Sequence, residues 1–162
     1  PMASRLSPAI SGTVTDSRRS VGAVRRIVVP VDPTITTGRA VELACRLGES
    51  QQALIVLTHV VAVPRQLPLD HPLPETRRRG ERALAIGQAI VAEHGLPCET
   101  RLLTGRSAAG SIVGLAGEIG ADLIVMTLSA GDAADREGIG RTVEEVLRRA
   151  PCEVLVVRGG RR

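Results

Sequence analysis

The residues best suited to chemistry lie in one polar segment, residues 127–142, between a short apolar run and an apolar stripe of helical spacing. The segment holds glycines, whose backbone N–H groups can approach an anion closely, and Arg136 and Arg141, whose guanidinium groups bind phosphate as a fork. It also holds acidic side chains that would repel a polyphosphate. These are Asp132, Asp135 and Glu137. The segment is therefore a candidate ligand loop whose charges act in both directions on an anion, and the alternative is a structural loop or one with another ligand.

Other common catalytic chemistries have no candidate residues. All 21 basic residues are arginine, which excludes Schiff-base and P-loop lysines. The histidines His59, His71 and His94 have no Cys, His or Asp at metal-ligand spacing and fit no Ser/His/Asp array, and no pair of carboxylates is spaced for acid–base catalysis. We expect a packed, hydrogen-bonded His59, no metal site and no enzyme activity.

Alternating apolar patterns predict the elements that position the loop. Five short apolar runs are typical of strands, at residues 27–31, 54–61, 98–103, 122–126 and 154–157. Four helical patterns separate them, which predicts an α/β three-layer α/β/α sandwich around a five-stranded parallel sheet. Ligands of open parallel sheets bind beyond the carboxyl ends of the strands, so the 127–142 segment should face a binding crevice.

Two helices carry specific expectations. In the helix predicted over residues 75–94, the side chains expected to face the sheet are Ala83, Ile86, Ala89 and Ile90, and Gly95 should end the helix. The last helix has an apolar stripe at Val143, Val146, Leu147 and Ala150 and stops before Pro151. Its first residues, Thr142 and Glu145, fit a capping box.

Composition and charge exclude two classes of partner, nucleic acids and the membrane interior. The net charge of +4 invites a nucleic-acid interpretation, but the arginines are scattered and the chain has no Phe, Trp or Tyr to stack on bases, so we expect no nucleic-acid binding. Arg77, Arg78, Arg79 and Arg82 are interpreted as a solvated helix face rather than a partner patch. No apolar run is long enough for membrane insertion. Residues 1–24 should form a flexible basic tail, and residues 159–162 a short C-terminal tail. The three cysteines have no spacing typical of a metal site. We expect them to be buried thiols, in a cytoplasmic protein.

Four motifs carry a resemblance to a known family. RRIVVPVD at residues 25–32, LIVLTHVV at 54–61, ADLIVM at 121–126 and LRRAPCEVLVVR at 147–158 occur in the order typical of the universal stress protein family. The chain resembles that family over about residues 25–158. The resemblance implies strand order 3-2-1-4-5, as in adenine nucleotide alpha hydrolase-like folds, so that Asp32 and the loop face one crevice. It also implies a homodimer formed through the last strand, residues 153–158.

The resemblance implies a nucleotide site with a degenerate phosphate loop. ATP-binding members carry Gly, two residues, Gly, nine residues, then Gly-Ser or Gly-Thr. In alignment, Thr127 and Ala130 replace the first two glycines, Gly140 keeps the third, and Arg141 replaces the hydroxyl residue, with Thr142 next to it. The base-binding half is expected at Pro30, Val31, Asp32, Val60 and Met126. Asp32 has a second interpretation, as a turn residue that bonds nearby backbone N–H groups.

The functional hypothesis is a universal stress protein-like binding and signalling module in stress response. It would be a cytoplasmic homodimer with weak or lost ATP binding, acting through a protein partner rather than by catalysis. One alternative is a true ATP- or AMP-binding member with slow ATP hydrolysis. Another is a regulatory domain associated with a transport protein.

Overall fold

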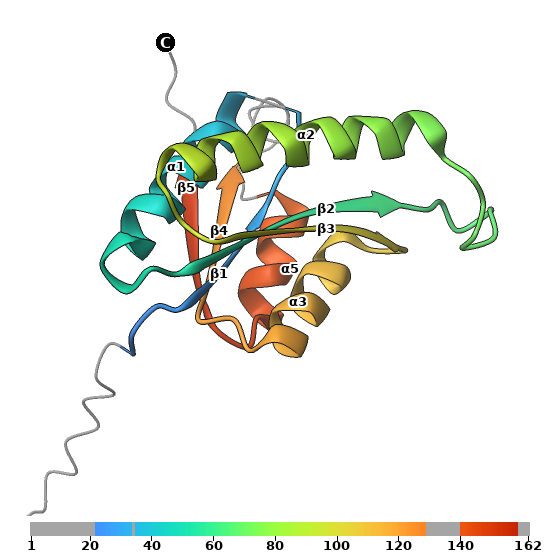
Figure 1. The fold of residues 1–162 in the computed structure, drawn as a ribbon. Coiled ribbons are helices and arrows are strands. Elements are labelled where there is room, and N and C mark those ends of the chain that lie inside the picture. The colour runs from blue at the N-terminus through green and yellow to red at the C-terminus, as the bar shows by residue number, and fades with distance from the viewer. Residues whose placement is uncertain (1–21, 34, 129–139, 159–162) are drawn as a thin grey trace, which may run out of the picture.

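A computed structural model describes residues 22–33, 35–128 and 140–158, so most of both predicted tails lies outside the described residues. The described residues form a five-stranded parallel sheet of order β3-β2-β1-β4-β5 (Figure 1). The strands are β1 (Arg26–Pro30), β2 (Leu54–Ala62), β3 (Cys98–Gly105), β4 (Leu123–Leu128) and β5 (Glu153–Arg158). The predicted fold class and strand order are confirmed. The neighbours β1 and β4 mark the point where the strand order reverses.

Helices cover both faces of the sheet (Figure 1). The first face carries α1 (Ile35–Gly48), which continues into the 3-10 helix η1 (Glu49–Gln51), and α2 (Pro74–Glu93); the second carries α3 (Ala108–Ile119) and α5 (Arg141–Arg149). Successive strand residues point to opposite faces, so Val28 of β1 joins the core under α3 and α5, while its neighbours Ile27 and Val29 join the core under α1 and α2. The fold therefore has two apolar cores that share the central strands.

The face that α2 turns to the sheet differs from the predicted one. Its buried residues are Gly80, Ala83, Leu84, Gly87 and Val91. Ile86 is 59% exposed and Ala89 is also exposed, so the prediction is wrong for both. A Cβ atom at Gly87 would lie 2.9 Å from Cδ1 of Leu57, and one at Gly80 would lie 2.9 Å from Cγ of His59. The two glycines allow α2 to lie close to β2. The prediction considered only apolar side chains, so it did not recognise a buried helix face that is formed in part by glycines.

Glycine ends two of the helices. Gly95 follows α2 with φ of 67°, as predicted, and Gly120 follows α3 with φ of 62°. The Gly120 N–H bonds the carbonyls of Ala116 and Gly117. Both glycines adopt the left-handed conformation that a side chain disfavours, so the chain turns sharply into the next strand at these positions.

The three cysteines are free thiols. Cys45 is buried, as expected, whereas Cys98 and Cys152 are half-buried. Burial, with a smaller contribution from the Glu42 carboxylate, raises the pKa of Cys45 to about 11. Burial also raises the pKa of Cys98 and of Cys152. Thiols with raised pKa values form little thiolate at neutral pH, which suits a structural role.

We expect Cys45 to be the slowest thiol to react with a maleimide at pH 8. Its pKa of about 11, against an ordinary value of 9.0, leaves about a hundredfold less thiolate than a free cysteine. Because the folded-state pKa is the higher one, the stability from the neutral thiol is complete below pH 9.0 and is lost as the pH rises toward 11. Peptide mapping by mass spectrometry gives the three rates, and labelling of Cys45 as fast as Cys98 would contradict this.

Candidate functional site

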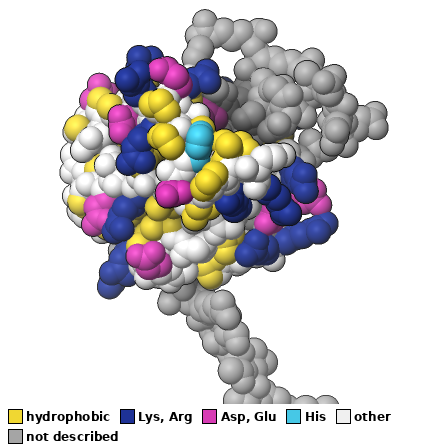
Figure 2. All heavy atoms as spheres, turned by 90° about the vertical axis from the view of Figure 1, so that its right-hand side faces the viewer, with side chains coloured by type: hydrophobic (Ala, Val, Ile, Leu, Met, Phe, Trp, Pro, Cys, Tyr) yellow, Lys and Arg dark blue, Asp and Glu magenta, His cyan; other side chains and the backbone are white. Residues whose placement is uncertain are grey.

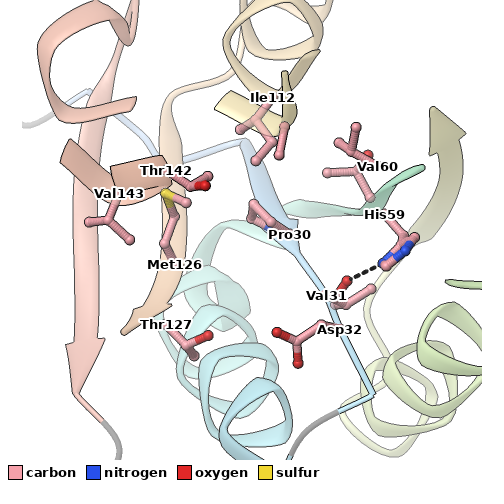
Figure 3. A pocket seen from close by; sticks show the side chains of 12 residues that line it. Pro30, Val31, Asp32, His59, Val60, Ile112, Met126, Thr127, Thr142 and Val143 are labelled. Carbon is pink, nitrogen blue, oxygen red and sulfur yellow. Dashed lines mark hydrogen bonds between the residues drawn. The ribbon is translucent and has the colours of Figure 1, made fainter. Parts of the chain in front are cut away.

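A cavity lies where the carboxyl ends of β1, β2 and β4 meet the starts of α3 and α5 (Figure 3). Its volume is about 200 Å³. We name it the switch-point cavity, because it lies beyond β1 and β4, where the strand order reverses. Its lining residues are Pro30, Val31, Asp32, Thr58, His59, Val60, Ala108, Ile112, Met126, Thr127, Thr142 and Val143.

The structure brings most of the predicted site residues together in this cavity. Those that line it are Pro30, Val31, Asp32, Val60, Met126, Thr127 and Thr142. Gly140 and Arg141 stand at the start of α5, next to Thr142, but are not among the lining residues. Ala130 lies outside the described residues. Thr127 belongs to β4 rather than to the loop where it was expected, so its side chain is held by the sheet.

Asp32 stands just beyond β1, at the entrance to the first turn of α1. Its carboxylate Oδ1 accepts a hydrogen bond of 2.8 Å from the Thr37 hydroxyl, and its backbone N–H donates to the same hydroxyl oxygen at 3.2 Å. This reciprocal pair braces the turn into α1 through the Thr37 hydroxyl, whereas the turn interpretation expected the Asp32 carboxylate to bond backbone N–H groups. The side chain is only partly buried and faces Thr127 across the cavity (Figure 3). A carboxylate so placed can accept hydrogen bonds from hydroxyl or amino groups of a ligand.

The wall of the cavity is aliphatic. Pro30, Val60, Ile112 and Met126 come from three strands and a helix and surround its centre (Figure 3). The chain contains no Phe, Trp or Tyr. A flat ring bound here would lie between aliphatic side chains and gain its stability from apolar burial rather than stacking.

The start of α5 supplies hydrogen-bond donors. Gly140 is its N-cap residue, and no side chain caps the helix, so the predicted capping box between Thr142 and Glu145 is wrong. The helix begins at Arg141, which makes Thr142 its second residue and too late to serve as the cap. Glu145 instead pairs with Arg149 at 2.8 Å. The Thr142 hydroxyl therefore lines the cavity beside backbone N–H groups that have no partner within the helix.

His59 connects the cavity to α2. Its Nδ1 lies 2.7 Å from the carbonyl oxygen of Val31, and a carbonyl only accepts, so Nδ1 carries the proton of this bond (Figure 3). The other side of the ring packs against Gly80. The expectation of a packed, hydrogen-bonded histidine is confirmed. The histidine fixes the backbone beside Asp32, so a change in α2 can reach the cavity through one side chain.

Sequence reasoning missed five of the lining residues. They are Thr58, His59, Ala108, Ile112 and Val143. Ile112 and Val143 each belong to an apolar face of a predicted helix. Such a face predicts burial in the core, but it does not distinguish a core residue from one that lines a cavity. Thr58 and His59 interrupt an otherwise apolar strand, and this polar interruption is the pattern that could have identified them.

The site combines a carboxylate, an aliphatic wall and a helix N-terminus. Such a site can hold a ligand with a flat apolar ring and an anionic end. Among residues 22–33, 35–128 and 140–158, no group of three His, Cys, Asp or Glu side chains could hold a metal ion. Within the same ranges, every helix is too short or too polar to cross a lipid bilayer.

Comparison with known proteins agrees with the fold. The model of the universal stress protein family matches residues 23–158. A universal stress protein of Methanocaldococcus jannaschii is 27% identical over 147 residues, which cover 87% of this chain and 86% of that protein.

Solved structures of the same family share the architecture. The universal stress protein of Archaeoglobus fulgidus in complex with dAMP has a TM-score of 0.65 and 20% identity, over 82% of this chain and 96% of that one. A family member from Arabidopsis thaliana with AMP bound has a TM-score of 0.62 and 20% identity, over 84% of this chain and 92% of that one. With a family model that spans nearly the whole described chain, the conclusion is direct: this chain belongs to the universal stress protein family.

Proposed function

We propose that the chain binds an adenine nucleoside monophosphate in the switch-point cavity and works as a binding and signalling module without catalysis. The observation that carries the proposal is the joint placement of Asp32, an aliphatic wall and the start of α5 around one cavity of about 200 Å³. Relatives of the same fold, from Archaeoglobus fulgidus and Arabidopsis thaliana, hold dAMP and AMP respectively.

The base half of the site is the better equipped. Adenine is flat and largely apolar, so it can lie between Val60, Ile112 and Met126, and burying it there is favourable without an aromatic partner. The Asp32 carboxylate can accept a hydrogen bond from the ribose hydroxyls or from the adenine amino group. These contacts are the same for AMP and ATP, so they give affinity without distinguishing the two.

The phosphate half limits the affinity for ATP. One phosphate group can be held by the Thr142 hydroxyl and by the first N–H groups of α5, which have no partner within the helix. The β- and γ-phosphates would need the close-approach glycines that Thr127 and Ala130 replace in the sequence motif, and the negative charges of Asp132 and Asp135 in the same segment oppose a polyphosphate. We therefore expect ATP to bind with a dissociation constant of about 0.1 to 1 mM, worth roughly 4 to 5.5 kcal/mol.

The first test replaces the Thr142 hydroxyl by a methyl group of the same shape. In Thr142→Val, AMP affinity should fall about tenfold, because a hydrogen bond to a charged group is lost. Adenosine, which has no phosphate, should bind both proteins equally. Isothermal titration calorimetry with the two ligands gives the comparison. Equal AMP affinity in both proteins, or a parallel loss of adenosine binding, would place the phosphate elsewhere.

The same proposal includes a cytoplasmic homodimer that signals to a protein partner in stress response. Its structural support is β5, which is an edge strand of the sheet, with no strand on its outer side among residues 22–33, 35–128 and 140–158. Leu155 on this strand is 36% exposed. An exposed aliphatic side chain on an open edge is stabilised when a second copy covers it.

Leu155→Asp should convert the dimer into a monomer. A carboxylate at the centre of an apolar interface would be buried without a partner, which costs several kcal/mol. Leu155 suits this test better than Val156, which packs against the core under α3 and α5, so that a charge there would also destabilise the fold. Leu147, 44% exposed on α5, gives the control variant Leu147→Asp. Sedimentation velocity measures the oligomeric state of the wild type and of both variants, and the Leu147→Asp control should remain dimeric. A monomeric wild type, or a dimeric Leu155→Asp variant, would contradict the β5 interface.

A further inference from the structure

The connection between β2 and α2, residues 63–73, is exposed but firmly held. The Arg106 guanidinium donates to the carbonyl oxygens of Pro64 at 2.6 Å and Leu67 at 2.7 Å. The connection begins with a bond of 2.9 Å from the Val63 N–H to the Gly105 carbonyl. An arginine that ties two carbonyls from outside the segment fixes its shape. We name this segment the 63–73 loop.

A second cavity, which we name the loop cavity, lies between the 63–73 loop, the start of α2 and the far ends of β2 and β3. Its volume is about 340 Å³, and its lining is part aliphatic and part polar: Val61, Leu69, Asp70, His71, Pro72, Leu73, Pro74, Arg77 and Thr104. Leu69 is 50% exposed although it borders this hollow. A partner that covered this half-exposed leucine would bury its apolar surface, and little conformational entropy would be lost because the loop is already fixed.

The loop cavity is lined by one cation, Arg77, and one carboxylate, Asp70. The net positive charge comes from the surrounding segment, because residues 64–82 hold five arginines against three carboxylates. Arg77 lies 3.7 Å from Glu81, with both side chains more than half exposed, so this ion pair is weak. In the part of the chain that the structure describes, Arg65, Arg79 and Arg82 make no ion pair. Figure 2 shows this end of the molecule, where hydrophobic side chains lie directly beside dark blue arginines.

We propose that the loop cavity is a docking site for an acidic peptide segment of a partner protein that inserts an aliphatic side chain beside Leu69. The aliphatic part of the hollow provides the anchor, and the arginines provide the charge complementarity. The lining residue Thr104 belongs to β3, the outer strand of the sheet, so an extended peptide could continue along that open edge. A lipid surface fits less well, because it requires protruding rather than hollowed apolar groups.

The test uses the full chain and a defined probe, a short fluorescein-labelled peptide that alternates glutamate with leucine. Fluorescence anisotropy should show saturable binding that weakens with added salt. Leu69→Ser should lower the affinity about fivefold, since the peptide buries a side chain that is now half exposed. Leu47→Ser is the matched control, because Leu47 is 42% exposed on α1, and its affinity should equal that of the wild type.

Two further probes complete the experiment. A peptide with lysine in place of glutamate should not bind, because it would face five arginines. Vesicles containing anionic phosphatidylglycerol should not compete with the acidic peptide. The proposal is overturned if the acidic peptide does not bind at millimolar concentration, or if Leu69→Ser and Leu47→Ser bind it equally. Equal binding of the lysine peptide, or capture by the vesicles in place of the peptide, would also overturn it.

Discussion

Gly80→Ala should lower the free energy of unfolding by about 2 kcal/mol, although alanine favours helices. The new Cβ would lie 2.9 Å from Cγ and 3.0 Å from Nε2 of the His59 ring. Cγ is next to the backbone of β2, so the ring cannot move aside without breaking its bond of 2.7 Å to the Val31 carbonyl. Overpacking of roughly 1–3 kcal/mol and the loss of a hydrogen bond worth about 1 kcal/mol outweigh a helix-propensity gain of about 1 kcal/mol.

Gly114→Ala is the matched control for this prediction. Gly114 lies within α3, and a Cβ there would have no atom within 4 Å, so only the gain in helix propensity of about 0.5–1 kcal/mol should remain. Urea denaturation of the three proteins measures both effects. If Gly80→Ala is as stable as Gly114→Ala, α2 does not pack closely on His59. AMP affinity should also fall in Gly80→Ala, because His59 holds the backbone next to Asp32.

The triple change Thr127→Gly, Ala130→Gly and Arg141→Ser should strengthen ATP binding at least about tenfold, which corresponds to roughly 1.4 kcal/mol. The first change removes a side chain from the cavity wall. All three restore the glycines and the hydroxyl of the phosphate motif that the family resemblance implies, so backbone N–H groups could approach the outer phosphates. Titration calorimetry of the wild type and the triple variant gives the ratio.

Adenosine provides the control for the triple change. Its affinity should be equal in the two proteins, because the base half is untouched. Micromolar ATP binding by the wild type would mean that the loop is not weakened. Absence of any gain in the triple variant would mean that residues 127–142 do not hold the phosphates.

Much of the architecture follows from periodic apolar patterns. The runs at residues 27–31 and 54–61 predicted β1 and β2 because a strand buried on both faces is apolar at every position. The strand order came from the family resemblance and agrees with the sheet. Ile86 shows where pattern reasoning fails. Its size suggested burial, but the close approach of Gly80 and Gly87 to β2 turned it outward.

The candidate site was predicted best where it depends on strand ends. Asp32 follows β1, and Met126 lies near the carboxyl end of the neighbouring strand β4, so topology alone brings them together. The role of Thr142 depends on where α5 begins. The sequence predicted Thr142 as the N-cap residue, but the helix begins at Arg141, so Thr142 lies within its first turn and lines the cavity. Ile112 reaches the cavity through packing between elements far apart in the chain, which no local pattern encodes.

The most direct test of nucleotide binding in the switch-point cavity uses its methionine. The chain has two methionines, Met2 and Met126, and Met126 lines the cavity. In protein labelled with [methyl-¹³C]methionine, the Met126 signal should shift in a saturable way as AMP is added, while the Met2 signal stays in place. Ribose 5-phosphate, which lacks the base, should shift Met126 far less. An unchanged Met126 signal at millimolar AMP, or equal shifts of both signals, would contradict adenine binding in this cavity.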